Sequence, residues 1–336
     1  MKEEKQHFTP FMAKLLISMC IFAVMFTLAL FFGAADISLR NILLALTTNQ
    51  TGDEILIIRE IRLPRELGAI LVGAALGVSG AIMQGITRNP LADPGLLGLT
   101  AGANAALAIT MAFFPAVNYL GLTVVCFIGA AVGAALVFGV SVVKRGGFTP
   151  MRIVLAGAAV STFLYALAEG TAIYFKLSKD VSLWTAGGLV GTSWKQLQTI
   201  APFILFGIFV AILFSRQLTI LSLSEDVAIG LGQKTTRVKA VLFIVIVLLA
   251  GAAVALVGNM VFIGLMIPHM VRTFVGTDYR FIIPMSAISG ATLMLFADTI
   301  GRTISAPYET PVVAIIAIIG LPFFLFIIRK GGKAFS

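Results

Sequence analysis

Residues 62–88, RLPRELGAILVGAALGVSGAIMQGITR, contain an uncharged segment, 67–87, that follows two arginines and precedes a third. A helix of about 20 predominantly apolar residues is long enough to cross the hydrocarbon core of a bilayer. Gly73 and Gly77 lie four positions apart, and small residues at that spacing let helix backbones approach closely in lipid. The segment therefore predicts a transmembrane helix that packs tightly against a neighbouring helix.

The rest of the chain has the same character. Of its 336 residues, 59% are hydrophobic and 12% are charged, whereas a soluble domain has about 25% charged residues. This composition predicts an all-α, multi-span protein in a lipid bilayer. The net charge of +9 does not indicate a nucleic-acid partner, because no basic stretch is interleaved with stacking aromatic residues. The excess lysines and arginines are better interpreted as topology signals in loops.

Ten runs are apolar enough to be spans. They are 15–33, 67–87, 95–115, 119–142, 153–174, 196–214, 240–257, 258–275, 281–300 and 310–328.

The distribution of lysine and arginine orients these spans, because such residues are enriched on the cytoplasmic side. With the N-terminus inside, the basic loops at 144–152 and 215–239 also lie inside. The basic segment 329–333 has to lie inside too, so the doubtful run 258–275 must cross. We therefore predict a polytopic membrane protein of ten transmembrane helices, one domain of residues 1–336, with both termini cytoplasmic.

This topology places Arg62, Arg65 and Arg302 on the outer side of the membrane, whereas lysine and arginine are normally enriched on the cytoplasmic side. One interpretation is that they snorkel to lipid headgroups or pair locally. Arg62 with Glu66, and Arg302 with Asp298, have the i,i+4 spacing of helical ion pairs. The other interpretation is an external cationic rim that receives an acidic partner protein. The residues alone leave both open.

No energy source is visible in the chain. The stretch GLGQKTT at 230–236 superficially resembles a phosphate-binding loop, but that loop requires glycine directly before lysine and Gln233 stands there. We therefore expect no ATP site and no catalytic residues, and the chain alone is not expected to be an enzyme. We also expect no cofactor and no metal site, since His269 has no second ligand at a suitable spacing.

Glu169 is the acid that lies deepest in an apolar run. An intramembrane acid is a candidate functional residue, here a proton relay, although it can also be neutral or hydrogen-bonded inside a bundle. Two other functions therefore remain open. One is a proton-coupled secondary transporter that uses Glu169, and the other is a membrane scaffold or receptor that transports nothing.

The longest inside loop, 215–239, contains a predicted short helix. Ser224 can cap its start, Glu225 and Asp226 suit its first turn, and the glycines from Gly230 onward can end it. A short amphipathic helix in a cytoplasmic loop suits docking into a groove of another protein. Its alternative position is the membrane surface.

Several motifs together resemble those of the FecCD-type permeases, the membrane subunits of ATP-driven bacterial importers for iron–siderophores, haem and cobalamin. The resemblance covers nearly the whole chain and agrees with ten spans. The motifs are RLPR at 62–65, GAALGVSGAIMQGITRNPLADPGLLGLTAGA at 73–103, LGQK at 231–234, FIGLMIPHMVR at 262–272, ADTIGR at 297–302 and PVVAIIAIIGLPFFLFIIRK at 311–330.

The resemblance implies two docking sites. Arg62, Arg65 and Arg302 would pair with glutamates on the two lobes of an extracytoplasmic substrate-binding protein, while Arg59 lies outside the shared motif and its role stays open. On the cytoplasmic side the loop would enter a cleft of a separate ATP-binding subunit. The coupling residues implied there are Asp226, Ala228, Gly230, Leu231 and Gly232.

The resemblance also implies a second permease subunit, identical or related. The two would surround a path lined largely by the fifth span, with Glu169 and Trp184 as candidates to line it. We therefore expect the permease subunit of a binding-protein-dependent ABC importer in the bacterial cytoplasmic membrane. A ferric siderophore is the expected substrate, and haem or cobalamin remain alternatives.

Overall fold

The computed structural model describes residues 2–33, 38–142, 150–306 and 308–329, and all regular secondary structure in these ranges is helical. Seven helices are long and apolar enough to cross a membrane. They are α1 (Lys2–Phe31), α4 (Leu63–Thr87), α6 (Tyr119–Val142), α7 (Pro150–Tyr174), α9 (Trp194–Leu213), α12 (Thr235–Val257) and α14 (Tyr279–Thr303). Three shorter apolar helices are α5 (Leu99–Phe113), α13 (Ile263–Val275) and α15 (Val312–Arg329).

Short helices connect these elements. They are α2 (Leu39–Thr47), α3 (Asp53–Leu56), the π-helix η1 (Ile57–Arg62), the 3-10 helix η2 (Pro94–Leu97), α8 (Ser178–Thr185), α10 (Ser215–Leu223) and α11 (Glu225–Gly230). The sequence predicted α11 and missed the others, because they are too short to leave a 20-residue apolar run.

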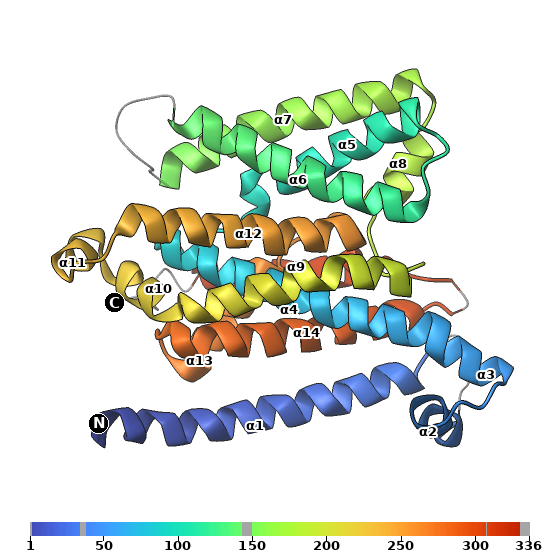
Figure 1. Ribbon diagram of the computed structural model, residues 1–336, viewed down its shortest axis with the longest axis horizontal. Helices are drawn as coiled ribbons and strands as arrows, with labels where there is room; N and C mark the ends of the chain where they lie inside the picture. Colours follow the sequence, from blue (N-terminus) through green and yellow to red (C-terminus); the bar gives the residue numbers. More distant parts are fainter. Residues whose placement is uncertain (1, 34–37, 143–149, 307, 330–336) are drawn as a thin grey trace.

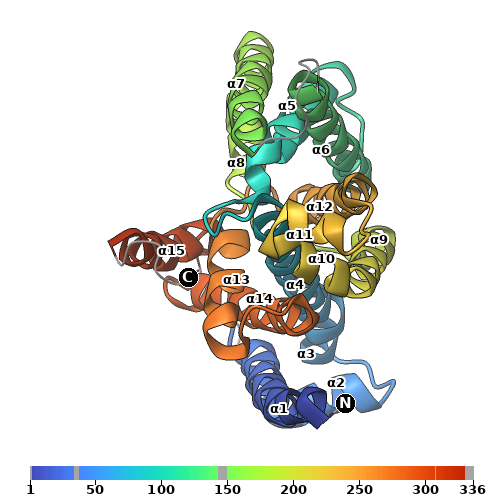
Figure 2. The ribbon, with the colours of Figure 1, turned by 90° about the vertical axis from the view of Figure 1, so that its left-hand side faces the viewer.

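The long helices lie side by side, and α4 occupies the centre of the bundle (Figures 1 and 2). It packs against α14, α12, α13 and α9, while α5, α6 and α7 form a group on the far side of α12. Helices α1 and α15 lie at the periphery.

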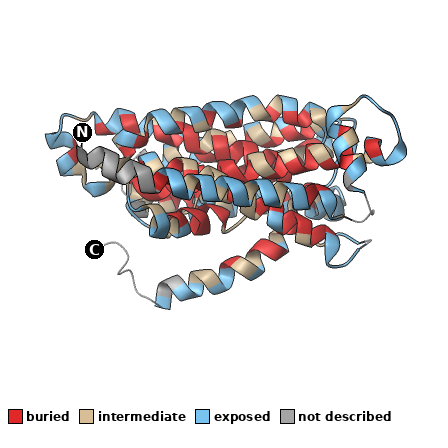
Figure 3. Cartoon of the chain, turned by 90° about the horizontal axis from the view of Figure 1, so that it is seen from below, coloured by how far each residue is buried: buried red, intermediate tan, exposed pale blue. Residues whose placement is uncertain are grey.

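Burial follows this arrangement (Figure 3). In the most apolar part of the central span, 89% of the residues are buried inside the protein, against 11% for α1. Peripheral helices instead expose large apolar side chains, among them Leu16 on α1, Phe163 on α7 and Ile318 on α15. Exposed apolar surface of this kind is suited to contact with lipid.

The bundle has two distinct ends (Figure 1). One, which we call the α11 end, contains α10, α11, the start of α1 and the end of α4. The other, the α2 end, contains α2, α3, α8 and the start of α9.

The contact between α4 and α14 is unusually close. A Cβ atom placed on Gly73 would lie 2.2 Å from the carbonyl oxygen of Gly290, and one on Gly290 would lie 2.2 Å from the carbonyl oxygen of Gly73. No side chain fits there, so only glycine allows these backbones to meet. The close helix packing that the sequence predicts around Gly73 and Gly77 is confirmed, since Gly77 meets the backbone of Ser286 in the same way.

The predicted third span, 95–115, is interrupted. Its first residues form η2, Gly98 adopts a left-handed conformation, and the regular helix α5 begins only at Leu99. The Asp93 carboxylate accepts a hydrogen bond of 2.7 Å from the Gly95 amide and so starts η2. The η2 backbone passes so close to α7 that a Cβ atom on Gly157 would lie 1.9 Å from the Leu96 carbonyl oxygen. The α4–α5 connection is therefore part of the bundle's packing.

Candidate functional site

Two features at opposite ends of the bundle are candidates for function. The first is a set of charged side chains at the α2 end, which we call the outer arginine cluster. The three arginines predicted to dock a partner come together there, and each is at most 8% exposed. The cluster consists of Arg62, Arg65 and Arg302 with Glu66, Asp298 and Glu309.

Arg65 bridges two carboxylates. Its Nε and Nη2 atoms donate to the fully buried Asp298 at 2.9 to 3.1 Å. Its Nη1 atom donates to Glu309 at 2.7 Å, and the Glu309 side chain is 38% exposed. The planar guanidinium thus holds one carboxylate inside the bundle and one at its surface.

Arg302, near the end of α14, contacts both α4 and α1. It pairs with Glu66 of α4, lies 3.4 Å from Asp298 and donates to the Ala29 carbonyl oxygen at 3.0 Å. The local pair of Arg302 with Asp298, one of the two expected at i,i+4 spacing, is therefore confirmed. Glu66, which was expected to pair with Arg62, pairs with Arg302.

Arg62 caps the end of α1. Its Nη1 atom donates to the carbonyl oxygens of Leu30 at 2.6 Å and Phe31 at 3.0 Å. The last carbonyl groups of a helix lack intrahelical hydrogen-bond donors and carry partial negative charge. The Arg62 guanidinium supplies the donors and a compensating positive charge. Arg62 and Arg302 together fasten the end of α1 to α4 and α14.

Arg59, whose role the sequence left open, does the same for α2. Its guanidinium donates to the carbonyl oxygens of Leu44, Ala45, Thr48 and Gln50, all near the end of that helix. Arg59 therefore holds α2 over the α2 end of the bundle.

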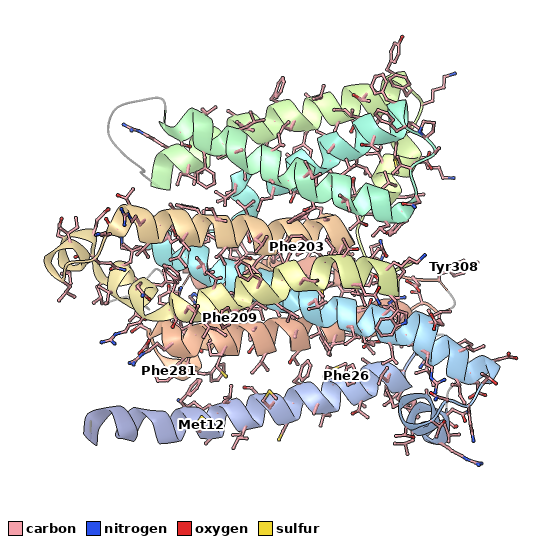
Figure 4. All side chains as sticks on the ribbon, viewed as in Figure 1. Met12, Phe26, Phe203, Phe209, Phe281 and Tyr308 are labelled. Atoms are coloured by element: carbon pink, nitrogen blue, oxygen red, sulfur yellow. The ribbon has the colours of Figure 1, made fainter. Side chains whose placement is uncertain are left out.

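The outer arginine cluster contains three arginines and three carboxylates. At the surface it presents Glu309 and the neighbouring Tyr308, which is 80% exposed (Figure 4). Sequence reasoning missed Glu309, because 244 positions separate it from Arg65 and no helical spacing connects them. The docking role of the arginines stays a prediction.

The second candidate feature is α11, at the other end. The Ser224 hydroxyl accepts a hydrogen bond of 3.1 Å from the Val227 amide, and Glu225 and Asp226 lie in the first turn. The helix ends at Gly230, and Gly232 follows at φ +78°, a conformation that only glycine adopts without strain. The helix predicted in this loop is confirmed, with the predicted cap.

The two faces of α11 differ. Val227, Ile229 and Leu231 are exposed, and Ala228 is fully buried against the rest of the chain. Of the implied coupling residues, Asp226, Gly230, Leu231 and Gly232 are exposed, whereas Ala228 supports the helix from beneath. Their role in coupling stays a prediction.

A salt bridge anchors α11 to α12. The Lys239 ammonium lies 2.6 Å from the Glu225 carboxylate. The hydrogen bond from Lys239 lowers the pKa of Glu225 below the ordinary glutamate value, and burial has a smaller, opposite effect on that pKa. The carboxylate therefore stays ionised at neutral pH, and α11 is held to the bundle as a preformed element.

Helix α7 carries the path candidate Glu169 on an exposed surface. At 100° per residue, Thr162 and Tyr165 share the face of Glu169. Phe163 and Leu167 lie on a second exposed face, which is apolar. The other path candidate, Trp184, lies on α8 and is partly buried against the core. Ile173, four residues after Glu169, is exposed on the same face, so Glu169 lies on a surface of mixed character.

In the described ranges, no group of three or more His, Cys, Asp or Glu side chains could hold a metal ion.

Comparison with known proteins gives a consistent result. Residues 21–330 match the FecCD transport family. The iron(3+)-hydroxamate import system permease protein FhuB of Bacillus subtilis is 45% identical over 94% of this chain and 83% of its own length. The Fe(3+)-citrate import system permease protein YfmD of the same organism is 40% identical, over 94% of both chains. The ferric enterobactin transport system permease protein FepD of Escherichia coli is 38% identical, over 90% of this chain and 91% of its own.

A solved structure agrees with these relatives. It shows an inward-facing conformation of a metal-chelate type ABC transporter. It superposes with a TM-score of 0.83 at 27% identity, over 95% of this chain and 99% of the other. The family match and the relatives each cover most of the chain, so this protein belongs to the FecCD transport family.

Proposed function

We propose that this chain is the permease subunit of a binding-protein-dependent ABC importer and that its substrate is a ferric siderophore. Its relatives carry names of import permeases for ferric hydroxamate, ferric citrate and ferric enterobactin. A hemin transport permease of Yersinia pestis is 40% identical over 80% of this chain, and haem therefore remains the competing substrate.

The observation that carries this proposal is the construction of α11. A capped, salt-bridged short helix that exposes Val227, Ile229 and Leu231 is prepared to dock into a groove. A permease without an ATP site of its own needs such an attachment to the subunit that hydrolyses ATP. The ATP-binding partner is therefore assigned to the α11 end.

This assignment sets the topology. The α11 end faces the cytoplasm of the bacterial cell and the α2 end faces outward, and the chain crosses the membrane ten times with both termini inside. Helix α13 has 13 residues and a length of about 20 Å. Together with the preceding nonhelical residues 258–262, α13 is long enough to cross the membrane. Helix α5 is also short, and η2 before it supplies the rest of that crossing.

The exposed position of Glu169 on α7 supports a second permease subunit. An ionisable side chain such as Glu169 is costly against lipid and normally faces a protein interior or a water-filled cavity. In the single chain Glu169 is exposed. A second subunit, identical or related, that faces α7 would place Glu169 in a shared translocation path and leave the Phe163 side to lipid.

The outer arginine cluster is assigned to the substrate-binding protein. Arg62, Arg65 and Arg302 are concentrated at the end opposite the ATP-binding partner. Arg65 lies directly behind the partly exposed Glu309, so an acidic partner that docks there can pair with it and be held in register.

Reconstitution tests the transport mechanism. Proteoliposomes that contain the permease, its ATP-binding subunit and its binding protein should take up iron-labelled ferric hydroxamate only with internal ATP. Glu169→Gln should keep the ATP requirement. Uptake that a proton gradient drives without the ATP-binding subunit, and that Glu169→Gln abolishes, would instead establish a proton-coupled transporter. A protein that moves no chelate under either condition would be a scaffold or receptor.

Growth on single iron sources tests the substrate. Cells that depend on this permease should grow on a ferric siderophore and fail when the gene is deleted. Growth restored on haem alone would assign the haem class.

A further inference from the structure

The outer arginine cluster contains one carboxylate that differs from the others. Asp298 and Glu66 are fully buried, whereas the Glu309 side chain is 38% exposed and binds the outward Nη1 atom of Arg65. We propose that Glu309 occupies the position on Arg65 that a carboxylate of the acidic substrate-binding protein takes when that protein docks. This inference rests on the proposed docking function and names the residue that regulates it.

The geometry of Arg65 allows such an exchange. Asp298 binds the Nε and Nη2 atoms and fixes the guanidinium from inside the bundle. The Glu309 contact uses only Nη1, and the Glu309 side chain is itself partly exposed. A guanidinium can hold two carboxylates on different edges. Replacing the outer carboxylate therefore leaves the inner pair intact.

The contact of Arg65 with Glu309 is expected to be weaker than its contact with Asp298. Ion pairs that water reaches contribute little, whereas breaking a buried pair by removing one partner is strongly destabilising. The Glu309 side chain is accessible and the Asp298 side chain is not. Docking can therefore displace Glu309 at small cost, and it leaves Asp298 in place.

Charge complementarity favours a carboxylate as the incoming group. With Glu309 in place, Arg65 has a carboxylate partner on each side of its guanidinium. When Glu309 turns away, one positive charge on the nearly buried Arg65 is left without its outer partner. An acidic side chain from the docking protein supplies a new outer partner for Arg65, and a neutral or basic surface does not.

The backbone around Glu309 is suited to this role. The amide of the next residue, Thr310, donates to the Gly301 carbonyl oxygen at 2.8 Å and ties the segment to the end of α14. Tyr308, on the other side, points away from the bundle (Figure 4). Rotation of the Glu309 side chain alone can expose Arg65 without moving a helix.

The test compares two variants that remove the same charge. Glu309→Gln and Glu60→Gln are made in the full permease complex in nanodiscs, and association of the ligand-free binding protein is measured at low and high salt. Glu60 is exposed on η1 at the same end, and no described residue forms an ion pair with it. Glu309→Gln should tighten binding about two- to fivefold, the range expected for an exposed pair. Glu60→Gln should change it by less.

A second pair of variants tests whether the gain runs through Arg65. Arg65→Lys keeps the positive charge but loses the forked geometry. The gain from Glu309→Gln should disappear in that background. Equal gains from Glu309→Gln and Glu60→Gln, or weaker binding of Glu309→Gln at unchanged thermal stability, would overturn the proposal. The comparison of the two glutamate variants is decisive even where Arg65→Lys folds poorly.

A further variant, in which the charges of Arg62 and Arg302 are both reversed, tests the docking function itself. If the arginines do not dock the binding protein, this double reversal leaves its affinity unchanged at low salt. The role of Glu309 fails separately when that double reversal weakens binding and Glu309→Gln has no specific effect.

Discussion

At the scale of single residues, the charged groups of the α2 end act first as structural fasteners. Arg59 and Arg62 satisfy carbonyl groups at the ends of α2 and α1, and Arg302 joins α1, α4 and α14. Buried charges require partners, and every arginine of the cluster has at least one. A docking function at this site therefore uses side chains that also hold the outer end of the bundle together.

Asp298 offers a test at this scale, because it contacts both Arg65 and Arg302. Asp298→Asn should destabilise the detergent-solubilised protein by about 3 kcal/mol, the lower end of the range for breaking a buried pair, since Glu309 and Glu66 remain. Thermal unfolding followed by tryptophan fluorescence measures the loss. Asp180→Asn, at an exposed position on α8, is the control. An equal, small change in both variants would show that the pair contributes nothing to the fold.

At the scale of helices, a glycine contact determines the geometry of the charged cluster. Gly73 lies eight residues after Arg65 on α4, and Gly290 lies eight residues before Asp298 on the antiparallel α14. Each interval is about 12 Å, slightly more than two helical turns. The close approach of the two glycines therefore brings Arg65 and Asp298 within bonding distance.

Gly73→Ala tests this contact. The added methyl group would lie 2.2 Å from the Gly290 carbonyl oxygen, so the helices must separate, at a cost of about 1–3 kcal/mol. Gly139→Ala is the matched control, because a Cβ atom there has no neighbour within 4 Å. Thermal stability in detergent should fall only for Gly73→Ala. The proposed packing would be refuted by a Gly73→Ala protein as stable as the control.

Helix α11 allows a separate test of coupling. A Cβ atom at Gly230 meets nothing within 4 Å in this chain, so Gly230→Trp should fold normally. The indole would protrude where the ATP-binding subunit is proposed to sit, and the ratio of transported chelate to hydrolysed ATP should fall at least tenfold. Gly139→Trp, which adds the same bulk on α6, should keep the normal ratio. Normal coupling in Gly230→Trp would remove α11 from the transmission of movement.

At the scale of the whole molecule, the two ends of the bundle are assigned to two sides of the membrane. Single cysteines at Lys195, on α9 at the α2 end, and at Asp226 on α11 report this directly. In intact cells whose native cysteines have been replaced, a membrane-impermeant thiol reagent should label Lys195→Cys and not Asp226→Cys. Tags at residues 1 and 336 should both be cytoplasmic. External labelling of Asp226→Cys would reverse the orientation.

The sequence by itself determined the elements that depend on local composition. Apolar runs near 20 residues predicted the long spans, because crossing lipid requires an unbroken hydrogen-bonded helix. The predicted run 119–142 matches α6 at both ends. Ser224, Glu225 and the glycines after them predicted α11, because caps act within one helical turn.

Only the tertiary structure decided which charges meet. Arg65 and Glu309 are 244 positions apart, and Arg302 and Glu66 are 236 apart. Local spacing favoured a pair of Arg62 with Glu66, yet α1 brings its carbonyl groups to Arg62 and α14 brings Arg302 to Glu66. The start of α5 at Leu99 also depends on the tertiary structure, since η2 packs closely against α7. These contacts depend on the separation and register of packed helices, which the Gly73–Gly290 contact sets and which no single stretch of sequence encodes.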